Sequence, residues 1–198
     1  MRVFLAVFVA IALWFAADDW RQRSIDHPPG VLAPDIPEQR DLSSATPLTH
    51  AGYMLTPRAQ IRVTARVLAG ERYRFSRAAD LMPRDLALGW GVMSDSAVLD
   101  QLKISQGDRF YFWRTRGPVP PVPVEAISAS SANMHLIPAN AAVEKVIDRV
   151  RVGQIITLHG RLVDVRTSEG GYMRTSLTRD DTGAGACEII YVEEARVQ

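Results

Sequence analysis

The stretch IRVTARVL, residues 61–68, alternates between apolar and polar side chains as far as Val67. A period of two with branched apolar residues is typical of a half-buried strand in an antiparallel sheet. Gly70 then permits a turn, and residues 71–75 continue or pair with the strand. The first regular element of the chain is therefore predicted to be a β-strand, and the rest of the fold is worked out from it.

The same alternation returns in the second half of the chain, at residues 128–136. One predicted face carries the apolar side chains and the other the polar ones: Ala132, Met134 and Leu136 against Ser131, Asn133 and His135. Asn140 is a good cap for a helix running to Val150. Three further strand-like segments follow, at residues 156–166, 172–178 and 187–195. The pattern predicts a mainly β (α+β) domain, antiparallel with short helices, and an OB-like Greek-key barrel is a candidate architecture.

The middle of the chain is predicted from turn signals. Pro83 and Gly89 bound a predicted short helix, and Ser94 is the predicted cap of a second one. Residues 103–114, KISQGDRFYFWR, predict a hairpin turning at Gly107-Asp108, with Phe110 and Phe112 toward the core and Tyr111 and Trp113 opposite. The prolines of residues 118–123 predict an extended connector.

The N-terminal third differs in composition. Val3 to Ala17 are fifteen consecutive apolar residues, which predicts a bilayer-inserted anchor or, alternatively, a cleaved signal. Five prolines between residues 28 and 47 predict an extended tether with no core of its own. We therefore expect three parts: a transmembrane anchor or signal at 1–20, a Pro-rich tether at 21–54 and a β-rich globular domain at 55–198. The short N-terminus predicts that the domain lies across a bacterial inner membrane, in the periplasm.

Composition excludes several classes of protein. The net charge of the 198-residue chain is +1, which gives no general attraction to nucleic acid. A single cysteine excludes an internal disulfide framework and any zinc site built from several thiolates. No phosphate loop or dinucleotide fingerprint is present, so neither a cofactor nor a metal is predicted.

Two sets of residues are candidates for function. Cys187 follows a glycine-containing loop, and His135 lies on a polar strand face. If the fold brings them together they form a thiol–imidazole pair, with Gly183 and Gly185 as oxyanion donors and Arg174 or Arg179 as carboxylate ligands. The alternative is a purely structural role, in which Cys187 is buried in a packed strand. The second set is aromatic, namely Trp90, Tyr111 and Trp113, and is interpreted as a partner-binding surface.

Four segments of the chain are distinctive: LALGWGVMSDSAVLD (86–100), ISQGDRFYFW (104–113), SSANMHLIPAN (130–140) and SLTRDDTGAGACEIIYV (176–192). Together they resemble a family of uncharacterised bacterial membrane-anchored proteins, over roughly residues 60–195. The resemblance implies a membrane-anchored protein and assigns no catalytic residue.

These observations favour a periplasmic accessory or assembly subunit that docks on a larger membrane protein complex and contacts the bilayer through Val3 to Ala17. The alternative, from a different class, is a cell-envelope acyl-transfer or hydrolytic enzyme with Cys187 as nucleophile and His135 as base.

Overall fold

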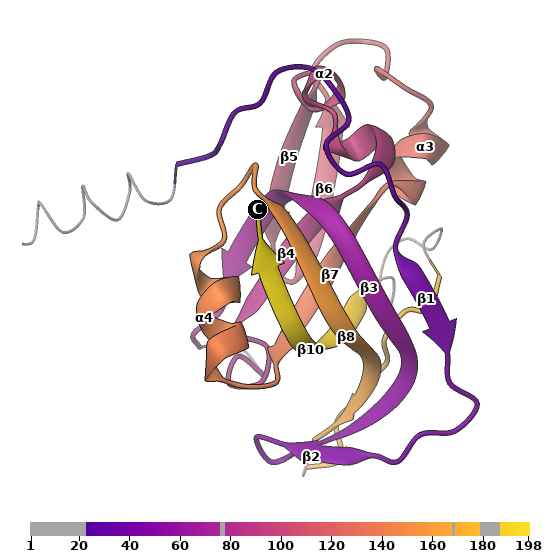
Figure 1. The fold of residues 1–198 in the computed structure, drawn as a ribbon, viewed down its shortest axis with the longest axis vertical. Helices are drawn as coiled ribbons and strands as arrows, with labels where there is room; N and C mark the ends of the chain where they lie inside the picture. Colours follow the sequence, from indigo (N-terminus) through magenta and orange to yellow (C-terminus); the bar gives the residue numbers. More distant parts are fainter. Residues whose placement is uncertain (1–22, 76–77, 168, 179–186) are drawn as a thin grey trace, which may run out of the picture.

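The computed structural model describes residues 23–75, 78–167, 169–178 and 187–198. The fold is mainly β, as predicted. Five strands pair in a closed ring, each with the next (Figure 1): β3 (Tyr53–Arg72), β4 (Arg84–Gly89), β7 (Ser131–Pro138), β10 (Glu188–Val197) and β8 (Ile155–Arg166), which returns to β3. All pairs in the ring are antiparallel except β7 with β10, which are parallel.

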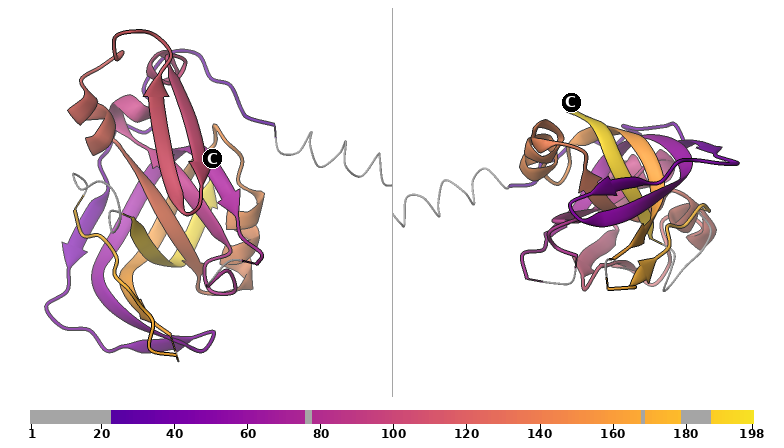
Figure 2. Two further views of the ribbon diagram at one scale, coloured as in Figure 1. Left: turned by 180° about the vertical axis from the view of Figure 1, so that it is seen from behind. Right: turned by 90° about the horizontal axis from the view of Figure 1, so that it is seen from below.

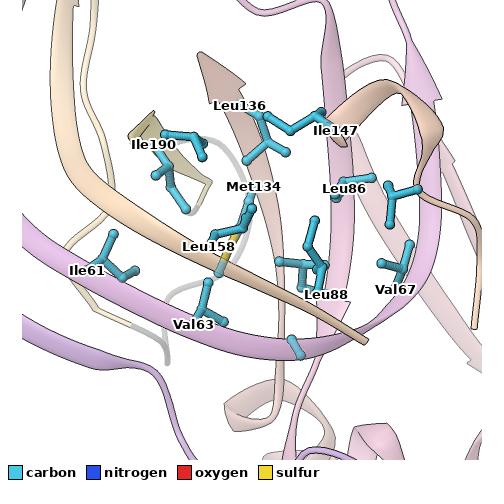
Figure 3. Close-up of a cluster of buried hydrophobic side chains, with 14 of the residues drawn as sticks. Ile61, Val63, Val67, Leu86, Leu88, Met134, Leu136, Ile147, Leu158 and Ile190 are labelled. Atoms are coloured by element: carbon cyan, nitrogen blue, oxygen red, sulfur yellow. The ribbon is translucent and has the colours of Figure 1, made fainter. Parts of the chain in front are cut away.

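β3 closes the ring because it pairs with two different strands. Residues from Met54 to Arg66 lie against β8, and residues from Arg66 to Arg72 lie against β4. Its alternating apolar side chains point into the ring, as the sequence pattern predicted. There they meet aliphatic side chains from the other strands (Figure 3), among them Leu86, Leu88, Met134, Leu136, Leu158 and Ile190. This cluster is the main hydrophobic core and the chief source of stability.

Helix α4 (Ala141–Arg149) packs on the same core through Val143 and Ile147. The Asn140 side chain accepts hydrogen bonds from the main-chain N–H groups of Ala142 and Val143, so the predicted cap is confirmed. At the other end, the buried Arg84 guanidinium donates to the main-chain oxygens of Ile147 and Val150. A cation at this end of a helix satisfies carbonyls that have no partner within it.

The outer face of the ring is covered by a second, two-stranded sheet (Figure 2), formed by β5 (Leu102–Gly107) and β6 (Phe110–Thr115). Three short helices adjoin it: η1 (Gly91–Ser94), α2 (Ser96–Leu99) and α3 (Val124–Ala129). The hairpin is confirmed, but its two faces are the reverse of the prediction. Tyr111 and Trp113 pack inward, and Phe110 and Phe112 are 38% and 55% exposed. The two inward rings pack on a hydrophobic cluster that includes Ala87 and Ile127. The Tyr111 hydroxyl also lies 3.4 Å from the Ser131 hydroxyl, a contact that phenylalanine cannot make.

The predicted helix between Pro83 and Gly89 is wrong, since these residues form strand β4. All six residues of β4 are buried, with the core on one side and the hairpin on the other. A strand covered on both faces loses its period-two pattern, which is why the sequence did not reveal it. The next helix, α2, begins one residue after Asp95, whose side chain caps it, whereas the predicted cap Ser94 binds the N-terminal segment instead.

Residues 23–50, the predicted tether, lie against the domain. Two short strands, β1 (Glu38–Asp41) and β2 (Leu48–His50), pair with β3. Further upstream, the main-chain N–H of Ile25 donates to the oxygen of Val152 at 2.8 Å. A Cβ on neighbouring Gly153 would come within 2.0 Å of the Ile25 oxygen, so glycine is required there. The remaining small strand, β9 (Tyr172–Met173), pairs antiparallel with the end of β8.

The predicted anchor, Val3 to Ala17, lies outside the described residues. Within the described part of the chain, no helix has the length and apolar character needed to cross a bilayer.

Candidate functional site

Asp85 and His135 are directly opposite one another on the neighbouring strands β4 and β7. Their chain neighbours Leu86 and Leu136 point into the core, so by the alternation of a strand both side chains point to the outer face. His135 Nδ1 lies 2.8 Å from Asp85 Oδ2. The Asp85 side chain is fully buried and that of His135 is 12% exposed, so this ion pair is shielded from water.

Cys187 reaches the same place from the other side of β7. Because β10 runs parallel to β7 with Ile189 opposite His135, Cys187 precedes that position by one strand period and shares its outward face. The thiol is partly exposed and lies close enough to His135 to raise the pKa of its imidazole. The amide nitrogen of Asn133, the β7 residue before Met134, lies 3.7 Å from the Cys187 sulfur. Cys187, His135 and Asp85 therefore form a continuous row of thiol, imidazole and carboxylate.

The main chain on both sides of this row is fixed by hydrogen bonds. The Ser176 N–H donates to the Cys187 oxygen at 3.1 Å, and the Ile189 N–H donates to the Thr175 hydroxyl at 3.0 Å. Thr175 and Ser176 are themselves buried. These hydrogen bonds thus fix Cys187 one strand period before the position opposite His135.

The electrostatics of the row favour a charged imidazole. Burial by itself lowers the pKa of His135, but hydrogen bonding and charge attraction from Asp85 and Cys187 outweigh burial and raise the pKa to about 9. His135 is therefore protonated at neutral pH. The site thus places a cationic ring between the Asp85 carboxylate and the Cys187 sulfur.

Arg109, at the tip of the β5–β6 hairpin, completes the surroundings. Its guanidinium lies 2.9 Å from Asp85 Oδ1, on the oxygen that His135 does not use. Each carboxylate oxygen thus faces its own cation. The Arg109 main-chain oxygen accepts from the Asn133 amide at 2.9 Å.

The two residues that the sequence proposed as a thiol–imidazole pair, Cys187 and His135, are brought together. Arg174 is exposed, and Gly183, Gly185 and Arg179 lie outside the described residues. Asp85 and Arg109 were not among the predicted site residues. A signal for Asp85 existed, since it is a charged residue directly before the apolar run LALGW, but reading that run as a helix hid the face it occupies.

The three aromatic candidates have different positions. Trp90 is 1% exposed within the main core, and its ring nitrogen donates to the Ala129 oxygen at 3.1 Å. Tyr111 and Trp113 lie on the covered side of the hairpin. Burial raises the pKa of Tyr111 to about 12, against a smaller opposing effect of Ser131, so its hydroxyl stays protonated. The exposed rings in this region are those of Phe110 and Phe112.

Among the described residues, no three or more His, Cys, Asp or Glu side chains are grouped so that they could hold a metal ion. Comparison with protein-family models, curated proteins and solved structures gives no match for this chain.

Proposed function

We propose that the protein is a thiol enzyme that transfers or hydrolyses acyl groups, with Cys187 as nucleophile, His135 as acid–base group and Asp85 as the residue that orients His135. One observation carries this proposal: β4, β7 and the residue that enters β10 place carboxylate, imidazole and thiol side by side, with Asp85 Oδ2 2.8 Å from His135 Nδ1 and Cys187 close enough to raise the pKa of His135. Cysteine nucleophiles in enzymes are activated by such a neighbouring imidazole, which is oriented by a third polar group.

The chemistry follows from the protonation state. The Cys187 thiolate attacks the carbonyl carbon of an ester, thioester or amide, forming a C–S bond. As the bond to the leaving group breaks, the imidazolium gives its proton to that group. Neutral His135 then takes a proton from water or from an acceptor nucleophile, which attacks the acyl–cysteine and releases the product and the thiolate.

Two further proposals concern architecture and location. The strand order β3-β4-β7-β10-β8-β3, the parallel β7–β10 pair and the helix between β7 and β8 support an OB-type barrel. The run Val3 to Ala17 supports an N-terminal anchor in the inner membrane with the domain in the periplasm.

A second candidate function is the accessory subunit that docks on a membrane protein complex. It is favoured by one observation: Phe110 and Phe112 lie on the uncovered side of the hairpin, with ring centroids 6.2 Å apart. Exposed neighbouring rings of this kind are typical of protein contacts. Purification of the tagged, full-length protein in mild detergent tests it, and recovery of the protein without a reproducible partner would count against it.

Alkylation of the native full-length protein with iodoacetamide tests the enzyme proposal. Cys187 is the only cysteine, so mass spectrometry reports on it alone. We expect modification at pH 7 without denaturant, and a rate about tenfold or more lower in His135→Gln, because the thiolate loses its cationic neighbour. His159→Gln, on an exposed position of β8, is the matched control and is expected to behave as wild type. Modification of wild-type protein only after denaturation would contradict the proposal.

Activity is then measured on thioester and ester substrates, with Cys187→Ser as the blank. An acyl–enzyme trapped on Cys187 and detected by intact mass is the expected result.

A further inference from the structure

Resting on the proposed function, we propose that Arg109 is a positioning residue of the site, whose guanidinium, anchored at the hairpin tip, holds the Asp85 carboxylate against His135. Arg109 belongs to an element that is not part of the closed ring. The inference therefore assigns to the β5–β6 hairpin a role in setting the geometry of the site.

The turn itself gives the first observation. Asp108 and Arg109 both have positive φ, 51° and 69°, and they join Gly107 to Phe110 as a two-residue hairpin loop. This loop needs positive φ at both central residues, and the second is normally glycine. An arginine there is locally unfavourable, so interactions of its side chain or main chain must offset that cost.

Those interactions are present on every side of Arg109. The guanidinium contacts Asp85 Oδ1 at 2.9 Å and the Met82 oxygen at 3.0 Å, and its central carbon lies 3.8 Å from the centre of the Tyr73 ring. The Arg109 N–H donates to the Tyr73 hydroxyl at 2.9 Å. The side chain is thus held by Asp85 of β4 and by Tyr73 and Met82, which lie between β3 and β4, and it cannot turn freely toward solvent.

Its main chain reaches the other end of the row. The Arg109 oxygen lies 3.7 Å from the Cys187 sulfur and also accepts from the Asn133 amide. Gln106, on the same hairpin, donates to the side-chain oxygen of Asn133. One residue therefore touches the carboxylate with its side chain and the thiol with its carbonyl.

Charge explains why an arginine is needed. Asp85 is fully buried, and an isolated buried carboxylate is strongly disfavoured. It faces His135 on β7, Arg109 on the hairpin and, across the β3–β4 pair, Glu71. With Arg109 2.9 Å from Oδ1 of this carboxylate, the other oxygen, Oδ2, lies 2.8 Å from His135 Nδ1. A fork of donors on a fixed turn suits this task better than a flexible amine.

The test distinguishes the effect of losing the Arg109 side chain from the effect of disturbing the hairpin turn. Arg109→Gly suits the positive φ, so the hairpin is expected to form, while every guanidinium contact is lost. Arg109→Lys keeps the charge. Arg114→Ala removes the same charge from an exposed position of β6 and is the matched control. Circular dichroism and thermal melts verify that all variants are folded at the temperature of the assay.

The direct readout is the proton NMR signal of the His135 Nδ1–H, which a carboxylate partner moves downfield and protects from exchange. We expect this signal in wild type, in Arg114→Ala and, weaker, in Arg109→Lys, and we expect it to be lost or broadened in Arg109→Gly. The second readout is iodoacetamide alkylation of Cys187 at pH 7, expected to be about tenfold slower in Arg109→Gly, since small misplacements of a reactive group cost this much.

An unchanged Nδ1–H signal in folded Arg109→Gly overturns the inference, whatever the thiol does. A wild-type Cys187 that is inert until denatured, together with a signal that does depend on Arg109, retains the inference and refutes the enzyme. The two proposals therefore fail separately.

Discussion

The two sides of the β4–β7 wall are made by the same short run of residues and have opposite chemistry. On the inner side, Leu86 and Leu136 have no exposed surface and belong to the main hydrophobic core. On the outer side, one residue away along each strand, Asp85 and His135 form a buried ion pair. The difference teaches that an interior position in this fold does not imply an apolar one. The hairpin creates a second interior, and that interior is polar where the site lies.

The inner side is expected to determine the stability of the fold. Leu136→Ala removes a fully buried side chain next to His135 and leaves a cavity, so we expect a loss of about 2–5 kcal/mol in the free energy of unfolding. Urea unfolding followed by circular dichroism measures it. At low temperature the folded fraction of this variant is expected to keep normal Cys187 alkylation. A loss below about 1 kcal/mol would mean that the inner face is not the main core.

The outer side is expected to determine how stability depends on pH. The pKa of His135 is raised to about 9 in the fold, against 6.5 for a free side chain, so the folded protein binds its proton more tightly. This contribution is fully present below about pH 6.5 and is lost as the pH rises through about 9. Its upper size is about 3.5 kcal/mol, at roughly 1.4 kcal/mol for each pH unit.

Urea midpoints between pH 6 and pH 10 test this expectation. Wild type is expected to lose stability across that range, and His135→Gln to show a flatter profile. Cys187→Ser provides the background from the thiol. Parallel profiles for wild type and His135→Gln would contradict the assignment of the pH dependence to this side chain.

The hairpin allows the smallest and most discriminating comparison, between its covered and uncovered sides. Phe112→Ser on the uncovered side is expected to change the free energy of unfolding by less than about 0.5 kcal/mol. Tyr111→Phe on the covered side removes the contact of the tyrosine hydroxyl with Ser131, which keeps its hydrogen bond to the Ile127 oxygen, and is expected to cost about 1 kcal/mol. Thermal melts of both variants under one set of conditions are sufficient. A larger cost for Phe112→Ser would mean that the hairpin faces are assigned the wrong way round.

The sequence predicted those parts of the fold in which a pattern is local. Strand β7 was predicted because one of its faces is apolar, and the cap of α4 because Asn140 precedes a helical period. Strand β4 was missed because both of its faces are covered. The faces of β6 were reversed because hydrophobicity alone ranks phenylalanine as more buried than tyrosine, whereas the neighbouring Ser131 favours a hydroxyl.

The sequence predicted the thiol and the imidazole of the candidate site, but not the other two residues that surround them. Cys187 and His135 could be named because thiol and imidazole are few in the chain. Asp85 and Arg109 come from a strand that was read as a helix and from a hairpin tip whose placement on the barrel is a long-range property. Nothing local to residue 109 indicates that it touches residue 85.

The parallel β7–β10 pair determines at which step of folding the Cys187–His135 pair can form. The sulfur and the imidazole are 52 positions apart along the chain, and they meet only when β10 inserts between β7 and β8. Pairing between segments this distant is slow, because a large loop must be closed before any contact compensates for it. A chain that has formed β3, β4, β7 and α4 but lacks this last insertion carries an ordinary thiol. During refolding, an increase in the reactivity of Cys187 would therefore report the time at which β10 pairs with β7 and β8 and closes the ring.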